Sequence, residues 1–203
     1  FIKQGWINRN YILVNKQKHL ITLPLAKISS YKLIMETFIN LENIPRWYKK
    51  FLYTIEFGYK KAPYYKEVLE LLIEIFGYIN QTETISEFNK VALKRVCQYL
   101  GIDTNIKNSN GKYHNNNLSG KDRVIDICNK ENATIYINAI GGYNLYVKEE
   151  FGKNNIQLYF LRTKDVFYKQ FDNEFIPNLS IIDVMMFNSI KDINKMLGKF
   201  ELL

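Results

Sequence analysis

Two glycine-containing loops of the sequence carry residue types suited to a negatively charged ligand. In the first loop, Gly120 precedes apolar residues at helical spacing, and Lys121 and Arg123 fall in the first turn. Backbone N–H groups at a helix start, with cationic side chains beside them, favour a phosphate group. An ordinary N-cap with solvated basic residues explains the same pattern, since neither the P-loop nor the G-x-G-x-x-G motif is complete. We interpret Gly120, Lys121 and Arg123 as candidate phosphate-binding residues.

The second loop is Gly141-Gly142, which follows a β-branched segment that ends at Asn138. Glycine lets a ligand approach the backbone closely, and an asparagine amide can both donate and accept hydrogen bonds. A tight turn is the alternative explanation. We interpret Asn138, Gly141 and Gly142 as candidate residues for orienting a substrate.

A third group near the N-terminus combines an indole, two amides and a guanidinium in Trp6, Asn8, Arg9 and Asn10. Arg9 can bind an anion in a bidentate geometry, and the amides can form directional hydrogen bonds. Alternatively, Arg9 pairs with a carboxylate and the two asparagines cap turns. Burying so many polar groups without a purpose costs stability, so all four are candidate substrate-binding residues.

Ser180 and Asp183 stand at the start of an apolar helical segment, residues 181–188. Ser180 is a favourable N-cap, and Asp183 has the spacing of a capping-box carboxylate that reaches back to the Ser180 N–H group. An acid–base role is the alternative for a carboxylate in so apolar a run. We prefer the capping box, keep Ser180 as a candidate substrate-binding residue, and name Asp183 as the candidate catalytic residue.

The segments that position the two glycine loops alternate between strand and helix. Residue types predict strands at 134–137 and 156–161, and apolar spacing predicts helices near 124–128 and 145–151. With a short strand ending at Ile106, this order predicts right-handed crossovers between parallel strands. We therefore predict an α/β fold built on a mostly parallel, Rossmann-like three-layer sheet whose loops lie at one edge.

Ahead of that region, the sequence predicts a β-hairpin and then a less regular segment. Residues 11–14 and 19–25 flank a polar turn, as expected for a hairpin. Residues 29–44 suggest a loop followed by a strand. A polar loop over residues 108–117 then leads to Gly120.

Helical signals dominate from Pro45, which suits the first turn of a helix. Apolar residues recur at three and four positions in three successive segments, and Thr84 or Ser86 is the N-cap of the third. We predict an inserted helical subdomain over residues 45–101 of a single α/β domain that covers residues 1–203. A last helix over 190–197 closes that domain.

Composition narrows the choice of partner. The 203 residues are 47% hydrophobic, which is enough for a full core, and the 15 Tyr and 13 Phe exclude low-complexity disorder. The net charge of +8 fits an anionic partner. Because the basic residues are scattered, we expect a small anionic substrate such as a nucleotide sugar, and no nucleic acid.

Cys97 and Cys128 each lie among apolar helical residues without a C-x-x-C pair, which predicts buried free thiols. No cluster of His, Cys and carboxylates has metal-ligand spacing, so we expect no metal, and the sequence leaves any cofactor unknown. No apolar run is long enough to span a membrane, and a signal peptide is absent. We expect a cytoplasmic protein without membrane insertion, and the Phe1 start suggests a longer parent.

Several strings in a fixed order resemble the WbqC-like family of bacterial proteins, and the resemblance spans almost the whole chain. The matching strings are 3–10, 22–24, Tyr59 with 62–64, Gly120 with 123–128, 136–137 with 141–142, and 179–183 with 187–188. Family members usually carry a further segment upstream of the first string, and this chain starts just after it. The family has no assigned catalytic residues to transfer.

The resemblance implies a role in bacterial surface-polysaccharide (O-antigen or capsule) biosynthesis. It implies a cytoplasmic transferase that moves an acyl or aminoacyl group, possibly glycine, onto an amino sugar held as a nucleotide conjugate. On this hypothesis Arg9, Lys121 and Arg123 hold phosphates. The alternative is a non-catalytic scaffold or ligand-binding module that contacts other assembly enzymes through exposed helical aromatics, which include Trp47, Tyr48, Tyr53, Tyr59, Tyr64 and Tyr65.

Overall fold

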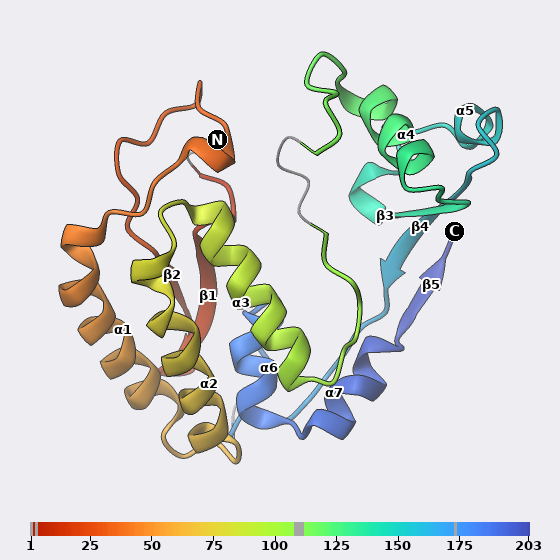
Figure 1. Cartoon of the computed structure of the whole chain (residues 1–203). Helices are drawn as coiled ribbons and strands as arrows, with labels where there is room; N and C mark the ends of the chain where they lie inside the picture. The colour runs from red at the N-terminus through yellow and green to blue at the C-terminus, as the bar shows by residue number, and fades with distance from the viewer. Residues whose placement is uncertain (1, 3, 108–111, 173) are drawn as a thin grey trace. The chain divides into compact units, whose positions relative to one another are not determined.

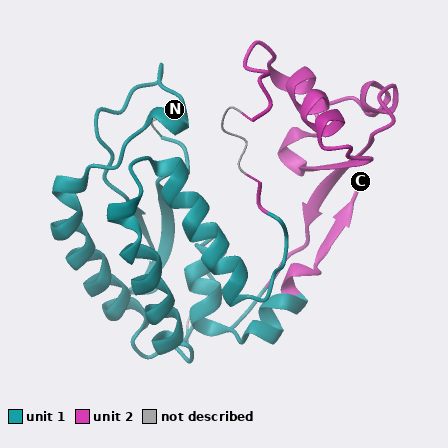
Figure 2. Ribbon diagram, viewed as in Figure 1, with its two compact units in different colours: residues 1–105, 167–195 teal, residues 106–166, 196–203 magenta. Residues whose placement is uncertain are grey.

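The computed structural model describes residues 2, 4–107, 112–172 and 174–203, and these form a mixed α/β structure with seven α-helices and two small sheets (Figure 1). Lys3 of the first family string and residues 108–111 of the predicted polar loop lie outside the described residues. Residue contacts divide the chain into two compact units (Figure 2). Unit 1 is Phe1–Asn105 with Phe167–Lys195, and unit 2 is Ile106–Val166 with Met196–Leu203.

Unit 1 begins with the predicted hairpin. Strand β1 (Arg9–Val14) pairs antiparallel with β2 (Gln17–Thr22) across a two-residue turn. The turn residues Asn15 and Lys16 both have positive φ values, 49° and 61°. A type I′ turn requires this geometry, which matches the right-handed twist of the flanking strands. The hairpin prediction is confirmed.

Helices α1, α2 and α3 lie beside this hairpin (Figure 1). Their bounds are Ile44–Tyr59, Tyr65–Gly77 and Ile85–Tyr99. Pro45 falls in the first turn of α1, where its missing N–H group has no helical partner to lose. Thr84 caps α3, and its hydroxyl and the Glu87 carboxylate each accept a backbone N–H bond in a capping box. These local signals fixed the helix starts.

Residues 29–44 form no strand, contrary to the expectation for that segment. Two short 3-10 helices occupy it, η1 (Ile34–Glu36) and η2 (Leu41–Asn43). Among the described residues, its β-pairing is limited to two isolated bridges, Leu25 to Ile39 and Phe38 to Thr84. A further short 3-10 helix, η3 (Ile79–Gln81), links α2 to α3.

Helix α6 (Ile181–Phe187) and most of α7 (Ile190–Leu197) complete unit 1. One continuous core joins the hairpin to these helices and to α1–α3. Ile12, Ile55, Val68 and Met185 are fully buried in it. Burial of apolar surface at about 25 cal/mol per Å² is therefore the main force that holds unit 1 together.

Unit 2 contains helix α4 (Gly120–Lys130), strand β3 (Ile135–Ala139), the short 3-10 helix η4 (Ile140–Gly142) and helix α5 (Lys148–Gly152). Strands β4 (Gln157–Thr163) and β5 (Phe200–Leu202) complete its sheet, in the order β3-β4-β5. Strand β3 pairs parallel with β4, and β4 pairs antiparallel with β5.

The mixed α/β class is confirmed, but the structure does not show the mostly parallel, Rossmann-like three-layer sheet. Within the described residues, one crossover forms, from β3 through α5 to β4. The backbone near Ile106 forms no strand. The N-terminal hairpin is a separate two-stranded sheet, and it is antiparallel because a two-residue turn can join only antiparallel strands. The single-domain assignment with a 45–101 subdomain stays a prediction.

The described helices include none with both the length and the apolar character needed to cross a membrane. The longest, α1, has 16 residues and carries lysines along its surface.

Gly58 of α1 allows the helix to approach β1 closely. A Cβ atom added at Gly58 would lie 2.7 Å from the backbone oxygen of Leu13. Real Cβ atoms do not approach a carbonyl so closely, and the strand backbone cannot yield as a flexible side chain would. The pairing of α1 with β1 therefore requires glycine at this position.

We predict that Gly58→Ala lowers the free energy of unfolding by about 1–3 kcal/mol because it forces helix and strand apart. Urea unfolding followed by circular dichroism measures this change. Gly77→Ala is the matched control, since a Cβ atom there meets nothing within 4 Å. Because alanine has the higher helix propensity, the control should be neutral or stabilising, and equal stability losses in both variants would contradict the prediction.

Candidate functional site

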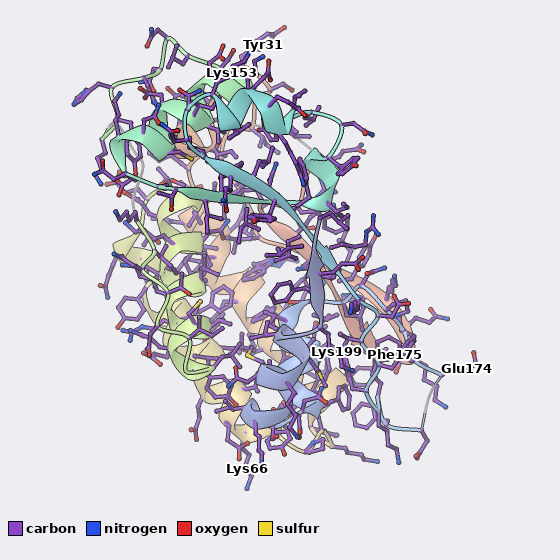
Figure 3. All side chains as sticks on the ribbon, turned by 90° about the vertical axis from the view of Figure 1, so that its right-hand side faces the viewer. Tyr31, Lys66, Lys153, Glu174, Phe175 and Lys199 are labelled. Carbon is purple, nitrogen blue, oxygen red and sulfur yellow. The ribbon has the colours of Figure 1, made fainter. Side chains whose placement is uncertain are left out.

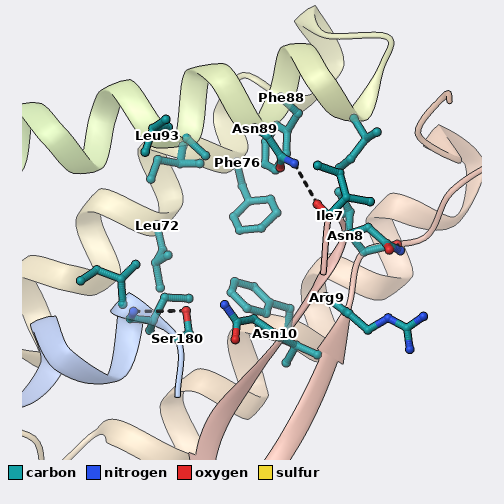
Figure 4. A pocket seen from close by; sticks show the side chains of 18 of the residues that line it. Ile7, Asn8, Arg9, Asn10, Leu72, Phe76, Phe88, Asn89, Leu93 and Ser180 are labelled. Carbon is teal, nitrogen blue, oxygen red and sulfur yellow. Dashed lines mark hydrogen bonds between the residues drawn. The ribbon is translucent and has the colours of Figure 1, made fainter. Parts of the chain in front are cut away.

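A pocket of about 430 Å³ opens in unit 1 where the start of β1, helices α1–α3 and the start of α6 come together (Figure 4). Its size falls within the range of small-molecule sites. The lining includes four candidates from the N-terminal string and one from the α6 start. The lining residues are Trp6, Ile7, Asn8, Arg9, Asn10, Ile21, Leu23, Trp47, Phe51, Leu72, Ile75, Phe76, Ile85, Phe88, Asn89, Ala92, Leu93, Val96, Ser180, Ile181 and Ile182.

Aromatic side chains form one wall of the pocket. The rings of Trp47 and Phe51 stack with centroids 5.1 Å apart and planes 7° from parallel. Phe76 packs against both Phe51 and Phe88, at 5.0 Å and 5.3 Å. Such a wall offers dispersion contacts and no hydrogen bonds, so it suits the apolar part of a ligand.

Two asparagine side chains form hydrogen bonds that fix the backbone just before β1. The Asn89 amide of α3 donates to the Ile7 carbonyl at 2.8 Å, and the Asn8 amide donates to the Leu23 carbonyl at 2.9 Å. The Asn8 Oδ1 atom is buried and has no hydrogen-bond partner among the described residues. An unpaired buried acceptor costs free energy, which a donor group of a ligand would recover.

The side chains of two other polar lining residues, Asn10 and Arg9, point in different directions. Figure 4 shows the Asn10 amide directed toward the pocket near Ser180, whereas the Arg9 guanidinium extends away from the pocket's centre. Asn10 Oδ1 accepts the Tyr11 backbone N–H at 2.8 Å, which leaves the amide nitrogen facing the pocket. The phosphate-binding role of Arg9 stays a prediction.

Ser180 is confirmed as the N-cap of α6, since its hydroxyl oxygen accepts the Ile182 backbone N–H at 3.3 Å. The capping box with Asp183 is wrong. The Ser180 backbone N–H donates instead to the Tyr11 carbonyl, at 2.7 Å. This bond joins the start of α6 to the free edge of β1, and it leaves the Asp183 carboxylate available to other donors.

The Asp183 side chain is fully buried in unit 1 and accepts three hydrogen bonds. The hydroxyl groups of Tyr59 and Tyr168 each donate at 2.7 Å, and the Gln170 amide donates at 2.8 Å. Asp183 is not one of the residues that line the pocket. Its position therefore favours an indirect effect on the pocket through the start of α6.

Burial raises the pKa of the Asp183 carboxyl above its ordinary value, and the three hydrogen bonds offset only part of that rise. Burial, together with the adjacent carboxylate, raises the pKa values of Tyr59 and Tyr168 far above those of exposed tyrosines. Both phenols therefore stay protonated and act as donors at neutral pH.

The network extends in two directions from Asp183. The Tyr59 hydroxyl accepts the Leu13 backbone N–H at 2.7 Å, which satisfies a β1 group on the edge away from β2. Gln170 forms two bonds with the Ile176 backbone, one as acceptor at 2.7 Å and one as donor at 3.1 Å. Phe175 (Figure 3) packs edge-on against Tyr168, with centroids 5.0 Å apart.

The first glycine-loop candidates belong to unit 2. Gly120 begins α4 with a φ of 51°, a left-handed conformation that glycine adopts without strain. Lys121 forms an ion pair with Glu150, and the Arg123 guanidinium donates to the Asn116 side chain at 3.4 Å. Protein groups thus already contact both cations, and their phosphate-binding role stays a prediction.

The second glycine loop also belongs to unit 2 and forms η4 at the end of β3. The Asn138 side chain accepts the Ala139 backbone N–H at 2.9 Å and lies directly against Gly142. A Cβ atom at Gly142 would collide with the Asn138 amide, whereas one at Gly141 would meet nothing within 4 Å. A side chain at position 142 would therefore displace the Asn138 amide from its present position. The substrate-orienting roles of Asn138, Gly141 and Gly142 stay predictions.

Sequence reasoning missed several residues of the pocket and of the Asp183 network. Asn89 could have been found, because it is an amide among apolar residues on one side of α3. Tyr59 was named in a family string and among the helical aromatics of the scaffold alternative, and neither pointed to a buried hydrogen bond with Asp183. Tyr168 and Gln170 lie in a segment without regular structure, where no periodicity points to a buried partner.

Comparison with known proteins gives one family match. The model of a family described as "WbqC-like protein family" matches residues 1–195. The uncharacterized protein Rv1507c of Mycobacterium tuberculosis is 29% identical over 189 residues, which cover 91% of this chain and 78% of that protein. No solved structure matches the chain.

We predict that Tyr59→Phe lowers the free energy of unfolding by about 2–4 kcal/mol, because the Leu13 N–H group and the Asp183 carboxylate each lose a buried partner. Urea unfolding measures the loss. Tyr53→Phe on the same helix is the control, since Tyr53 is 68% exposed. A loss no larger than that of the control would show that the network does not stabilise unit 1.

We predict that Asp183→Asn changes how stability depends on pH. Because the folded protein binds the Asp183 proton more tightly than the unfolded chain, this group's contribution falls as pH rises from about 4 through its raised pKa. The stability of the wild type relative to Asp183→Asn should therefore decrease over that window in urea unfolding series. Asp172→Asn, at an exposed carboxylate, corrects for the loss of one charge. A relative stability that instead grows with pH would mean that the donors favour the ionised form.

Proposed function

Because the chain belongs to the WbqC-like protein family, we propose that it is a transferase of bacterial surface-polysaccharide assembly. In this proposal it moves an acyl or aminoacyl group onto an amino sugar held as a nucleotide conjugate. The observation that carries the proposal is the unit 1 pocket, in which an apolar wall faces asparagine and serine side chains. A compound with an apolar group next to a carbonyl needs both kinds of surface.

The aromatic wall of Trp47, Phe51 and Phe76 would bind the apolar part of the acyl donor. The Asn10 amide would donate to the donor's carbonyl oxygen, and the Ser180 hydroxyl lies near it (Figure 4). An amide donor placed beside the oxygen that gains negative charge lowers the barrier of acyl transfer. Trp6 and Asn8 belong to the same lining.

In the transfer step, the amine nitrogen of the sugar attacks the carbonyl carbon of the donor and forms an amide bond. The bond to the leaving group breaks, and the leaving group departs with the electron pair of that bond and takes up the proton that the amine loses. Within unit 2, phosphate contacts by Lys121 and Arg123 and sugar contacts by Asn138 and the Gly141-Gly142 backbone stay predictions, and the acyl-donor site proposed in unit 1 does not depend on them. Asp183 is assigned the role of a positioning residue for the α6 start, and its role in proton transfer stays a prediction.

A second candidate function is a non-catalytic ligand-binding module. The described residues that line the pocket include no carboxylate, imidazole or thiol, so the lining itself offers no general base. A docking scaffold has less support. Tyr59 is fully buried, and Trp47 lies within the aromatic wall, although Tyr53 and Phe57 are exposed.

We predict that Ala92→Phe, which places a ring in the pocket from α3, lowers transfer by at least about tenfold through exclusion of the donor. Mass spectrometry of mixtures of acyl or aminoacyl thioesters with nucleotide-linked amino sugars would detect the product. Lys94→Ala is the control, because Lys94 is exposed on α3 and does not line the pocket.

Equal amounts of product from Ala92→Phe and from the wild type would show that the pocket does not bind the acyl donor. Binding of a thioester to the wild type by calorimetry, with no product from any acceptor, would favour the ligand-binding module instead.

A further inference from the structure

A second, smaller pocket of about 210 Å³ lies between β2 and α1 in unit 1. Strand β2 contributes His19 to Thr22, and α1 contributes Trp47, Lys50, Phe51 and Thr54. Ile21, Trp47 and Phe51 line this pocket and the larger one alike. The two pockets are therefore neighbours that share one wall.

The two pockets differ in chemistry. The larger one is walled by stacked and tilted aromatic rings. The smaller one shares Trp47 and Phe51 but is otherwise lined by a lysine, a histidine and two threonines together with Leu20 and Ile21. Lys50 is exposed, and its ammonium group forms no ion pair with any described residue. The Thr54 hydroxyl is already a donor to the Lys50 carbonyl at 2.8 Å, and its oxygen can accept a further bond. Lys50 thus gives the smaller pocket a positive charge without a protein counterion.

We propose that the two pockets form one site for an amphipathic anion. The apolar part of the ligand lies against the aromatic wall of the larger pocket, and its carboxylate or phosphate group is bound by Lys50 in the smaller one. This inference rests on the proposed function, because it defines the donor as an acyl compound that carries a negative charge beyond its apolar group.

The shared wall is the reason to assign both pockets to one ligand. Trp47 and Phe51 are one helical turn apart on α1, so their rings stack along the helix. Lys50 precedes Phe51 on the same turn and lines the smaller pocket beside the ring pair. An apolar molecule alone would leave the Lys50 charge unused, and a free anion alone would leave the aromatic wall uncovered.

Matched ten-carbon probes test the inference: decanoate, decyl phosphate, the neutral decanol and the cationic decylamine. Both tryptophans of the chain, Trp6 and Trp47, line the larger pocket, so intrinsic fluorescence reports binding. We expect the wild type to bind decanoate and decyl phosphate about three- to tenfold more tightly than decanol, with a preference that shrinks as salt is added.

Lys50→Met should abolish the preference for the anions while the affinity for decanol stays unchanged. Lys50→Glu should reverse the preference in favour of decylamine. Lys49→Met is the matched control, because Lys49 is the exposed neighbour on α1 and lines neither pocket. This control should retain the preference of the wild type.

The outcomes separate this inference from the function on which it rests. Equal affinity of the wild type for decanoate, decyl phosphate and decanol would overturn the inference alone and leave an apolar donor pocket. A preference for the anions that survives Lys50→Met would also overturn it. Absence of binding by all four probes would overturn the pocket's assignment to an acyl donor, and the inference with it.

Discussion

The buried Asp183 carboxylate is the constraint on which unit 1 depends. Removing a carboxylate from water costs several kcal/mol, and only good hydrogen bonds repay that cost. Three donors converge on it, from Tyr59 at the end of α1 and from Tyr168 and Gln170 in the irregular segment ahead of α6. Residues 124 positions apart in the sequence are thereby held in one arrangement. Loss of any one of these donors would leave the buried Asp183 carboxylate with fewer hydrogen bonds to offset its desolvation.

Contacts from α1 and from the start of α6 stabilise the edge of β1 that does not pair with β2. An open strand edge presents unpaired backbone groups that invite further pairing. Here the Tyr59 hydroxyl accepts the Leu13 N–H, and the Ser180 N–H donates to the Tyr11 carbonyl. Gly58 lets α1 lie directly on that strand. Side chains and one loop thus replace a third strand, and the start of α6 is fixed as a wall of the pocket.

Local chemistry was readable from the sequence, whereas long-range pairing was not. The N-cap of α3, predicted at Thr84 or Ser86 and found at Thr84, and the N-cap at Ser180 involve residues at most three positions apart. Both could be predicted because no tertiary contact is needed to form them. The prediction of a mostly parallel sheet is not shown by the structure, because the residue types of a strand do not specify which other strand it pairs with. For Asp183, a local carboxylate signal suggested the capping box, but burial beside two tyrosines decided its contacts.

Of the candidate site residues, those of the N-terminal string and Ser180 line one pocket. The aromatic wall was not anticipated, because Trp47 and Phe51 have the periodicity of ordinary core residues. The net positive charge of the chain likewise did not indicate where an anion would bind. Lys121 in unit 2 is paired with Glu150, whereas Lys50, which no motif marked, carries its charge next to the pocket. A basic composition therefore identifies a binding site only after the paired cations have been set aside, and the unpaired ones have been found beside a surface that a ligand can cover.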